Sequence, residues 1–127
     1  MTPEVVSTKE APEAVGPYSQ AVAFGNLLFL SGQIALEPKS GTLVGTTVES
    51  QTEQILRNMT AVLQARNLNL SHLVKTTVFL RNIGDFTKFN GVYERFLKKP
   101  YPARSTVEVS NLPKDALIEI EGVAYLP

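Results

Sequence analysis

The sequence contains no cysteine, a single histidine and no surplus of charge of either sign. The absence of cysteine excludes disulfide bonds, thiolate metal sites and a cysteine nucleophile. His72 has no suitably spaced histidine or aspartate partner, so we expect no metal ion. Twelve lysine and arginine residues balance twelve aspartate and glutamate residues. Because proteins that neutralise phosphates usually carry a basic surplus, nucleic-acid binding is not expected.

Long apolar stretches are also missing. No apolar run exceeds four residues, as in Leu27–Leu30, and this is far too short to cross a membrane. The first residues lack the basic start and apolar stretch of a secretory signal, and they carry Glu4, Glu10 and Glu13 but no arginine. We therefore expect a cytoplasmic protein. A mitochondrial location would require that a presequence had been removed.

The elements follow from turn residues and from apolar spacing. The chain has 127 residues without a repeat or linker, which fits one domain over 1–127. Gly25 and Asn26 indicate a hairpin turn between residues 18–24 and 27–31, and residues 1–17 are read as a short strand with an extended entry. We predict helices over 47–66 and from Asn82 to before Pro100, with further strands over 74–80, 103–109 and 117–125. This order predicts an α+β fold in which both helices cover one face of a single sheet.

Local patterns place the two helices. Thr46 and Glu49 resemble a capping box for the first helix, and Asn82 is expected to cap the second. Apolar side chains recur at helical spacing in both segments: Ile55, Leu56, Met59, Val62 and Leu63 in the first, and Phe86, Phe89, Tyr93, Phe96 and Leu97 in the second. We interpret the aromatic stripe of the second helix as core rather than as a stacking platform.

The sheet face away from the helices should remain apolar. Two helices cover only one side of a sheet, and the alternating strands place apolar residues on both sides. A large exposed apolar face usually marks a protein interface. The pattern therefore predicts a homo-oligomer.

Arg104 and two glutamates are the candidate polar groups. Arg104 lies on a predicted strand with Thr106 on the same face, and its planar guanidinium could bind a carboxylate. It could equally form a surface ion pair with a nearby glutamate. Glu119 and Glu121 share a strand face, which is typical of a solvated edge but also suits a general base. Tyr18 follows the rigid Gly16–Pro17 pair and could serve an interface or a ligand.

Six segments occur in an order that resembles the Rid/YjgF family of reactive-intermediate (imine and enamine) deaminases. The resemblance covers nearly the whole chain, and Pro-Ala-Arg-Ser is its most specific mark. The segments are Gly16–Ala21, Leu30–Ile34, Val74–Leu80, Phe89–Tyr93, Pro102–Ser105 and Ile118–Glu121.

The resemblance implies a chorismate-mutase-like α+β fold and a homotrimer with active sites in clefts between subunits. It implies hydrolysis of 2-iminobutanoate and 2-iminopropanoate, which exchange with enamines, to 2-oxoacids and ammonia. Pyridoxal-phosphate dehydratases release these imines, so the activity would protect pyridoxal-phosphate enzymes. The expected partners are small imino and keto acids, and no cofactor is expected.

The resemblance also assigns residues. It implies that Arg104 holds the substrate carboxylate and that Glu119 positions the hydrolytic water, so we expect both beside the substrate. The other substrate-binding residues that it implies are Tyr18, Ser31, Gly32, Asn90 and Thr106. Many family members have cysteine where this chain has Thr106, and the implied contact there is the backbone amide. The stretch 97–101 is shorter than in some members, so the rim of the cleft is expected to differ.

Two other functions compete with deamination. The same cleft could serve a non-enzymatic module that binds small carboxylates, or a chaperone-like protein, and the presence of Arg104 favours catalysis over both. Some members are described as RNA-cleaving translation inhibitors. The zero net charge and the single His72 count against that activity here.

Overall fold

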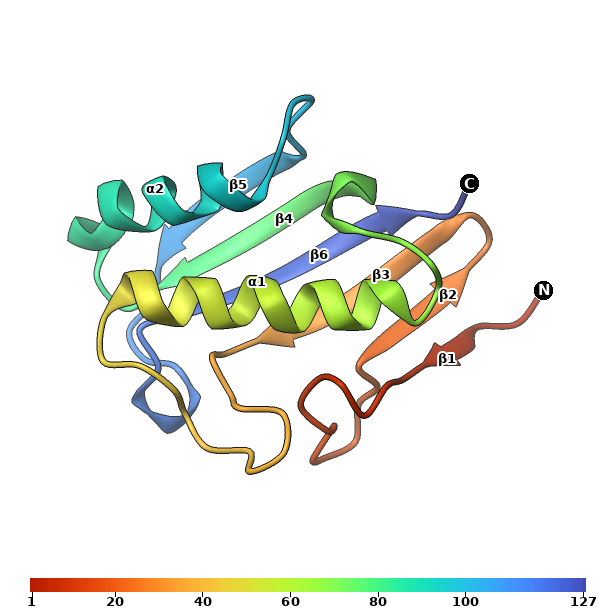
Figure 1. Ribbon diagram of the computed structural model, residues 1–127, viewed down its shortest axis with the longest axis horizontal. Coiled ribbons are helices and arrows are strands. Elements are labelled where there is room, and N and C mark those ends of the chain that lie inside the picture. Colours follow the sequence, from red (N-terminus) through yellow and green to blue (C-terminus); the bar gives the residue numbers. More distant parts are fainter.

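Six strands form a single mixed sheet in the computed structural model, which describes residues 1–127. The strand order is β1-β2-β3-β6-β4-β5, and only the edge pair β4–β5 is parallel. Figure 1 shows this order with the two helices lying across the sheet. The elements are β1 Glu4–Val6, β2 Ala21–Phe24, β3 Leu27–Gln33, α1 Val48–Gln64, β4 Leu73–Leu80, α2 Phe86–Phe96, β5 Ala103–Glu108 and β6 Ile118–Tyr125.

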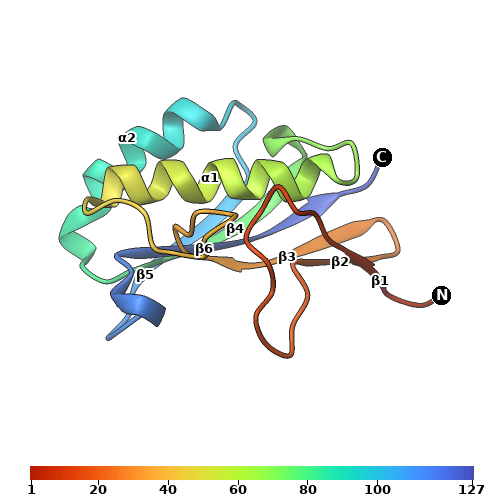
Figure 2. The same cartoon turned by 60° about the horizontal axis from the view of Figure 1, so that its bottom comes forward.

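Both helices pack on the same side of the sheet, which Figure 2 shows edge-on. This confirms the predicted α+β arrangement. Ile55, Leu56 and Met59 of α1 are fully buried. They belong to one apolar core with the inward residues of the central strands, such as Ile118 and Ile120. Burial of each such side chain contributes about 1.5–3 kcal/mol to stability.

The first helix begins one residue later than predicted. Thr47, rather than Thr46, is the N-cap, and its hydroxyl accepts a hydrogen bond from the Ser50 amide at 3.1 Å. The reciprocal partner is Ser50 instead of Glu49, because the Ser50 hydroxyl accepts from the Thr47 amide at 3.3 Å. Gly45 fixes this start: it turns with φ +86°, and a side chain there would collide with Ser50.

The second helix is also entered differently. Asn82 caps a 3-10 turn over Ile83–Asp85, where its side chain accepts from the Gly84 amide at 2.8 Å. This turn runs directly into α2, and Asp85 makes no side-chain cap hydrogen bond there. The predicted cap therefore acts one turn earlier than the α-helix itself.

The uncovered sheet face carries exposed apolar side chains, as the alternation predicted. These are Val5, Phe24, Phe29, Val107 and Tyr125, each more than two-fifths exposed. The homo-oligomer expected from this face stays a prediction. None of the helices has the length and apolar character needed to cross a bilayer.

Candidate active site

Arg104 lies on the edge strand β5 and points to the helix-covered side of the sheet. It pairs in register with Thr76 of β4, which in turn pairs with Gly122 of β6, and both of these neighbours are buried under the helices. The guanidinium carbon of Arg104 is 5.5, 5.1 and 4.9 Å from the ring centroids of Phe86, Phe89 and Tyr93 of α2. The rings bring Arg104 within range for cation–π attraction.

Arg104 has no carboxylate partner in the chain. The ion pairs of the structure join Glu53 to Arg57, Glu4 to Arg66 and Arg81 to Asp115. The surface ion pair considered for Arg104 is therefore not formed. Its N–H groups remain available to an external anion, and a planar carboxylate matches them best.

A cavity of about 440 Å³ opens beside Arg104. Asn90, predicted to bind substrate, lines it together with Arg104. The remaining lining residues come from α2 and from the segment before β5: Tyr93, Glu94, Tyr101 and Pro102. The cavity thus presents one cation, one carboxylate, one amide and two tyrosines, and the Arg104 guanidinium is the group in it that can bind a small anion.

A second cavity, of about 510 Å³, collects the other predicted residues. Tyr18, Ser31, Gly32 and Glu119 all line it, and Glu121 lies beside them. The Ser31 hydroxyl donates to the Ser19 carbonyl at 2.5 Å, so its proton is already used within the protein. The backbone amide of Val15 donates to the Tyr18 hydroxyl at 3.4 Å.

Glu119 is the candidate base of this second cavity. Its side chain lies so close to Gly32 that a Cβ atom there would stand 3.0 Å from the carboxyl carbon of Glu119. Burial raises the pKa of Glu119 above its ordinary value of 4.5, and the neighbouring charge of Glu121 raises it further. A carboxylate with a raised pKa accepts a proton from water more readily than an ordinary glutamate.

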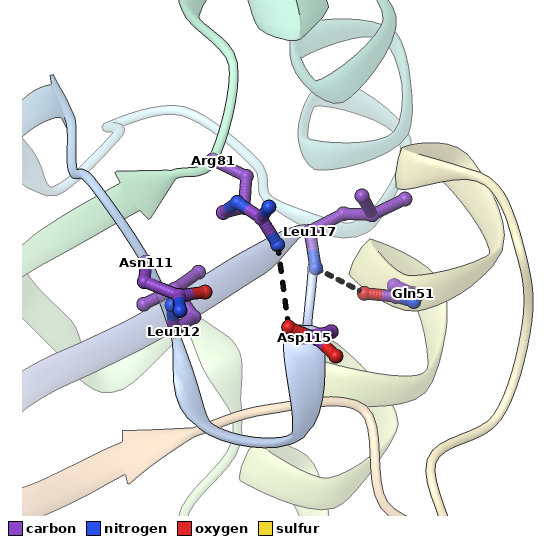
Figure 3. Close-up of polar contacts among 6 residues, drawn as sticks. All are labelled: Gln51, Arg81, Asn111, Leu112, Asp115 and Leu117. Carbon is purple, nitrogen blue, oxygen red and sulfur yellow. Dashed lines mark hydrogen bonds and ion pairs between the residues drawn. The ribbon is translucent and has the colours of Figure 1, made fainter.

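Buried amides hold the loops around the second cavity. The Gln20 side chain donates to the Pro12 carbonyl at 2.7 Å and accepts from the Thr8 amide at 2.7 Å, which ties the N-terminal loop to β2. Gln51 of α1 accepts from the Leu117 amide at 2.9 Å (Figure 3). Since Leu117 immediately precedes β6, this bond fixes the start of the strand that carries Glu119.

The turn before β6 is also held by an ion pair, and its backbone conformation is unusual. Arg81 lies 3.8 Å from the Asp115 carboxylate, an ion pair that Figure 3 draws as a dashed line. Lys114 and Asp115 both have φ of 56°, which is uncommon for residues other than glycine. Lys114 donates to the Gly41 carbonyl at 2.9 Å, so the loop after β3 and the turn before β6 support each other.

The two cavities belong to opposite faces of the sheet. In β4, Thr76 is the register partner of Arg104 and Phe79 that of Glu119. Residues an odd number of positions apart in a strand point to opposite faces. Within one chain Glu119 therefore does not neighbour Arg104, and the expectation that both lie beside the substrate stays a prediction.

Thr106 lies on the same face as Arg104, two positions along β5. It is half-buried and does not line the cavity beside Arg104. Its side-chain oxygen is buried and has no hydrogen-bond partner in the chain. The Thr106 side chain thus lines neither the cavity beside Arg104 nor the cavity beside Glu119.

Sequence reasoning missed the rings that contact Arg104. The helical spacing predicts that the aromatic stripe is core, and Phe89 and Tyr93 are buried there, yet these two rings and Phe86 also surround the guanidinium. One signal could have revealed this, because β4, α2 and β5 form a parallel crossover unit. Such a connection packs its helix back onto the two strands that it joins.

A family model described as Endoribonuclease L-PSP matches residues 8–126. The chain belongs to the YjgF/Rid family. Reactive Intermediate Deaminase A, chloroplastic, of Arabidopsis thaliana is 50% identical over 97% of this chain and 66% of its own length. The 2-iminobutanoate/2-iminopropanoate deaminase of Dermatophagoides farinae is 42% identical over 99% of each chain. Other relatives carry only the name RutC family protein.

The fold agrees with solved structures of this family. A Rid protein of unknown function from Yersinia pestis is 47% identical and superimposes with a TM-score of 0.95, covering 98% of this chain and 100% of the other. The YjgF/Rid fold is therefore shared over the whole sheet and both helices.

Proposed function

We propose that this protein hydrolyses 2-imino acids of the size of 2-iminobutanoate and 2-iminopropanoate to 2-oxoacids and ammonia. The observation that carries the proposal is the pair of complementary half-sites, an arginine without a carboxylate partner and a glutamate with a raised pKa. The names of two relatives support the substrate class. The proposed role is protection of pyridoxal-phosphate enzymes in the cytoplasm.

The reaction needs positioning more than activation. Arg104 binds the substrate carboxylate through two parallel N–H···O hydrogen bonds. Glu119 orients a water molecule and accepts its proton as the water oxygen bonds to the electrophilic carbon of the iminium group. Glu119 returns that proton to the nitrogen of the resulting carbinolamine, and the carbon–nitrogen bond breaks as the carbon–oxygen double bond forms. The proton of the carbinolamine hydroxyl is then lost to the departing ammonia, so that the products are the 2-oxoacid and ammonium. Holding water and substrate in line supplies most of the acceleration, and the proposal includes no cofactor.

This chemistry requires both half-sites at one substrate molecule. The carboxylate carbon and the reacting carbon of a 2-imino acid are joined by one bond of about 1.5 Å. Arg104 and Glu119 of a single chain face opposite sides of the sheet. We therefore propose that Arg104, Asn90 and the Thr106 amide of one subunit meet Tyr18, Ser31, Gly32 and Glu119 of the next.

The placement on opposite faces also limits the symmetry. A two-fold dimer interface joins one surface patch to itself, so it would unite the two half-sites only if one patch held both, and they lie on opposite faces of the sheet. A head-to-tail contact joins different patches, and a closed ring of such contacts leaves no half-site unpaired. The proposed assembly is a homotrimer with three such contacts, and the exposed apolar residues of the open face, such as Phe29 and Val107, support burial there.

A coupled assay with threonine dehydratase tests the function. Addition of the intact protein should accelerate release of 2-oxobutanoate, and Arg104→Ala should abolish the acceleration because the carboxylate contact is lost. Arg57→Ala is the matched control, since Arg57 also lies near a ring but is paired with Glu53 outside both cavities. Full activity of the Arg104 variant would refute the assignment.

A further inference from the structure

Three aromatic side chains of α2 gather around the guanidinium of Arg104. We call Phe86, Phe89 and Tyr93 the aromatic nest. Their ring centroids lie between 4.9 and 5.5 Å from the guanidinium carbon. Phe89 and Tyr93 follow Phe86 by three and seven residues, so one side of the helix presents all three rings to β5.

Two of the three rings of the nest are buried. Phe89 is fully buried and Tyr93 is nearly so. The Tyr93 hydroxyl lies 2.8 Å from the Thr76 hydroxyl, in a buried hydrogen bond to β4. The Phe89 and Tyr93 rings also contact each other at 5.2 Å between centroids. These contacts hold the Phe89 and Tyr93 rings between the helix and the sheet, and the held rings in turn restrict the arginine.

The arrangement leaves the N–H groups at the edge of the guanidinium free to donate hydrogen bonds. Aromatic rings attract a cation through their faces, whereas the guanidinium donates hydrogen bonds from its edge. Ring contacts therefore do not consume the N–H groups that a carboxylate needs. A free arginine side chain loses much rotamer freedom when it binds a ligand. An arginine already held by rings loses less, and binding is correspondingly tighter.

We propose that the aromatic nest consists of positioning residues that preorganise Arg104 for a planar carboxylate. This inference rests on the proposed function only in taking a small carboxylate as the ligand. The nest acts on the binding of the acid group, while Glu119 acts on water at the other half-site. Loss of a ring should therefore raise KM and leave kcat nearly unchanged, because the carboxylate is bound equally before and during the reaction.

Phe86 is the residue on which to test the nest, because it is partly exposed and its removal leaves the buried core in place. Phe86→Leu should weaken binding of 2-oxobutanoate, measured by calorimetry, about three- to tenfold. Phe86→Tyr keeps a ring and should restore the intact affinity. The matched control is Phe96→Leu, which removes a ring on the same helix from beside Arg57. It should leave the affinity unchanged.

A second readout does not depend on ligand. In the intact protein, ring currents should displace the NMR signal of the Arg104 Nε–H proton, and this signal should move toward the value of a free arginine in Phe86→Leu only. An unchanged signal together with unchanged affinity in Phe86→Leu would overturn the inference, as would an equal loss in Phe96→Leu. If 2-oxobutanoate binds and responds to Phe86 while the intact protein fails to accelerate imine hydrolysis, the nest is supported and the proposed reaction is refuted.

Discussion

Gly32 is the position where a single methyl group should separate catalysis from stability. A Cβ atom built at Gly32 would stand 3.0 Å from the carboxyl carbon of Glu119 and 3.3 Å from its Cγ atom, and it would overlap one carboxylate oxygen. Ordinary contacts begin near 3.4 Å. Because a glutamate side chain is flexible, Gly32→Ala should push the carboxylate aside rather than disturb the backbone.

The size of the effect follows from that displacement. Relief of the overlap requires the carboxylate to move by about 1 Å, and a misplacement of that size can reduce a rate about 100-fold. The free energy of unfolding should change by less than about 1 kcal/mol, since Gly32 does not have a positive φ and alanine also restricts the unfolded chain. We therefore expect a large loss of kcat in a protein that is folded normally.

The coupled dehydratase assay and thermal unfolding measure the two quantities on the same sample. Gly91→Ala is the control, because a Cβ atom there would meet nothing within 4 Å beyond its chain neighbours and the backbone of its own helix. It should keep full activity and gain stability of about 1 kcal/mol from better helix propensity. Full activity of Gly32→Ala would refute the role of Glu119. A loss of activity that merely follows unfolding would refute the steric argument.

Two further predictions concern the assembled site. The first mixes inactive Arg104→Ala and Glu119→Gln subunits, which are unfolded together and reassembled in equal amounts. Random mixing should restore about one quarter of the intact activity, since that fraction of head-to-tail contacts joins two unaltered half-sites. No recovery would refute a site shared between subunits. The second prediction concerns pH: activity that requires ionised Glu119 should fall as pH drops through its raised pKa. Burial and the charge of Glu121 both raise this pKa, and Glu121→Gln removes the second. The pKa of Glu119 should then fall, and the acid limb of the kcat/KM profile should move to lower pH. An acid limb that stays in place or moves to higher pH would contradict this.

Much of the fold could be read from local patterns. The apolar spacing of Ile55, Met59 and Val62 predicted α1, and the alternation of β6 correctly separated Ile118 from Glu119. The capping residue was harder, because Thr46 and Thr47 are adjacent and either could start a helix. The choice depends on the turn at Gly45, which only the folded loop defines.

The candidate site was less predictable than the fold. Alternation within a strand gives the relative faces of residues in that strand, but it does not relate Arg104 of β5 to Glu119 of β6. Their relation depends on β4, which lies between the two strands and sets the register of both. Such pairing joins residues far apart in the chain. For this reason the sequence could suggest both residues without revealing that one chain holds them apart.

The separation of the two half-sites makes the proposed activity a property of the assembly that obeys mass action. A lone subunit would offer either a cation or a base to a substrate, never both. On dilution below the concentration at which the ring dissociates, the rate per chain should fall with about the square of the protein concentration. Newly made chains would thus remain inactive until three of them assemble. The level of expression would set both the amount of protein and the fraction of it that is active.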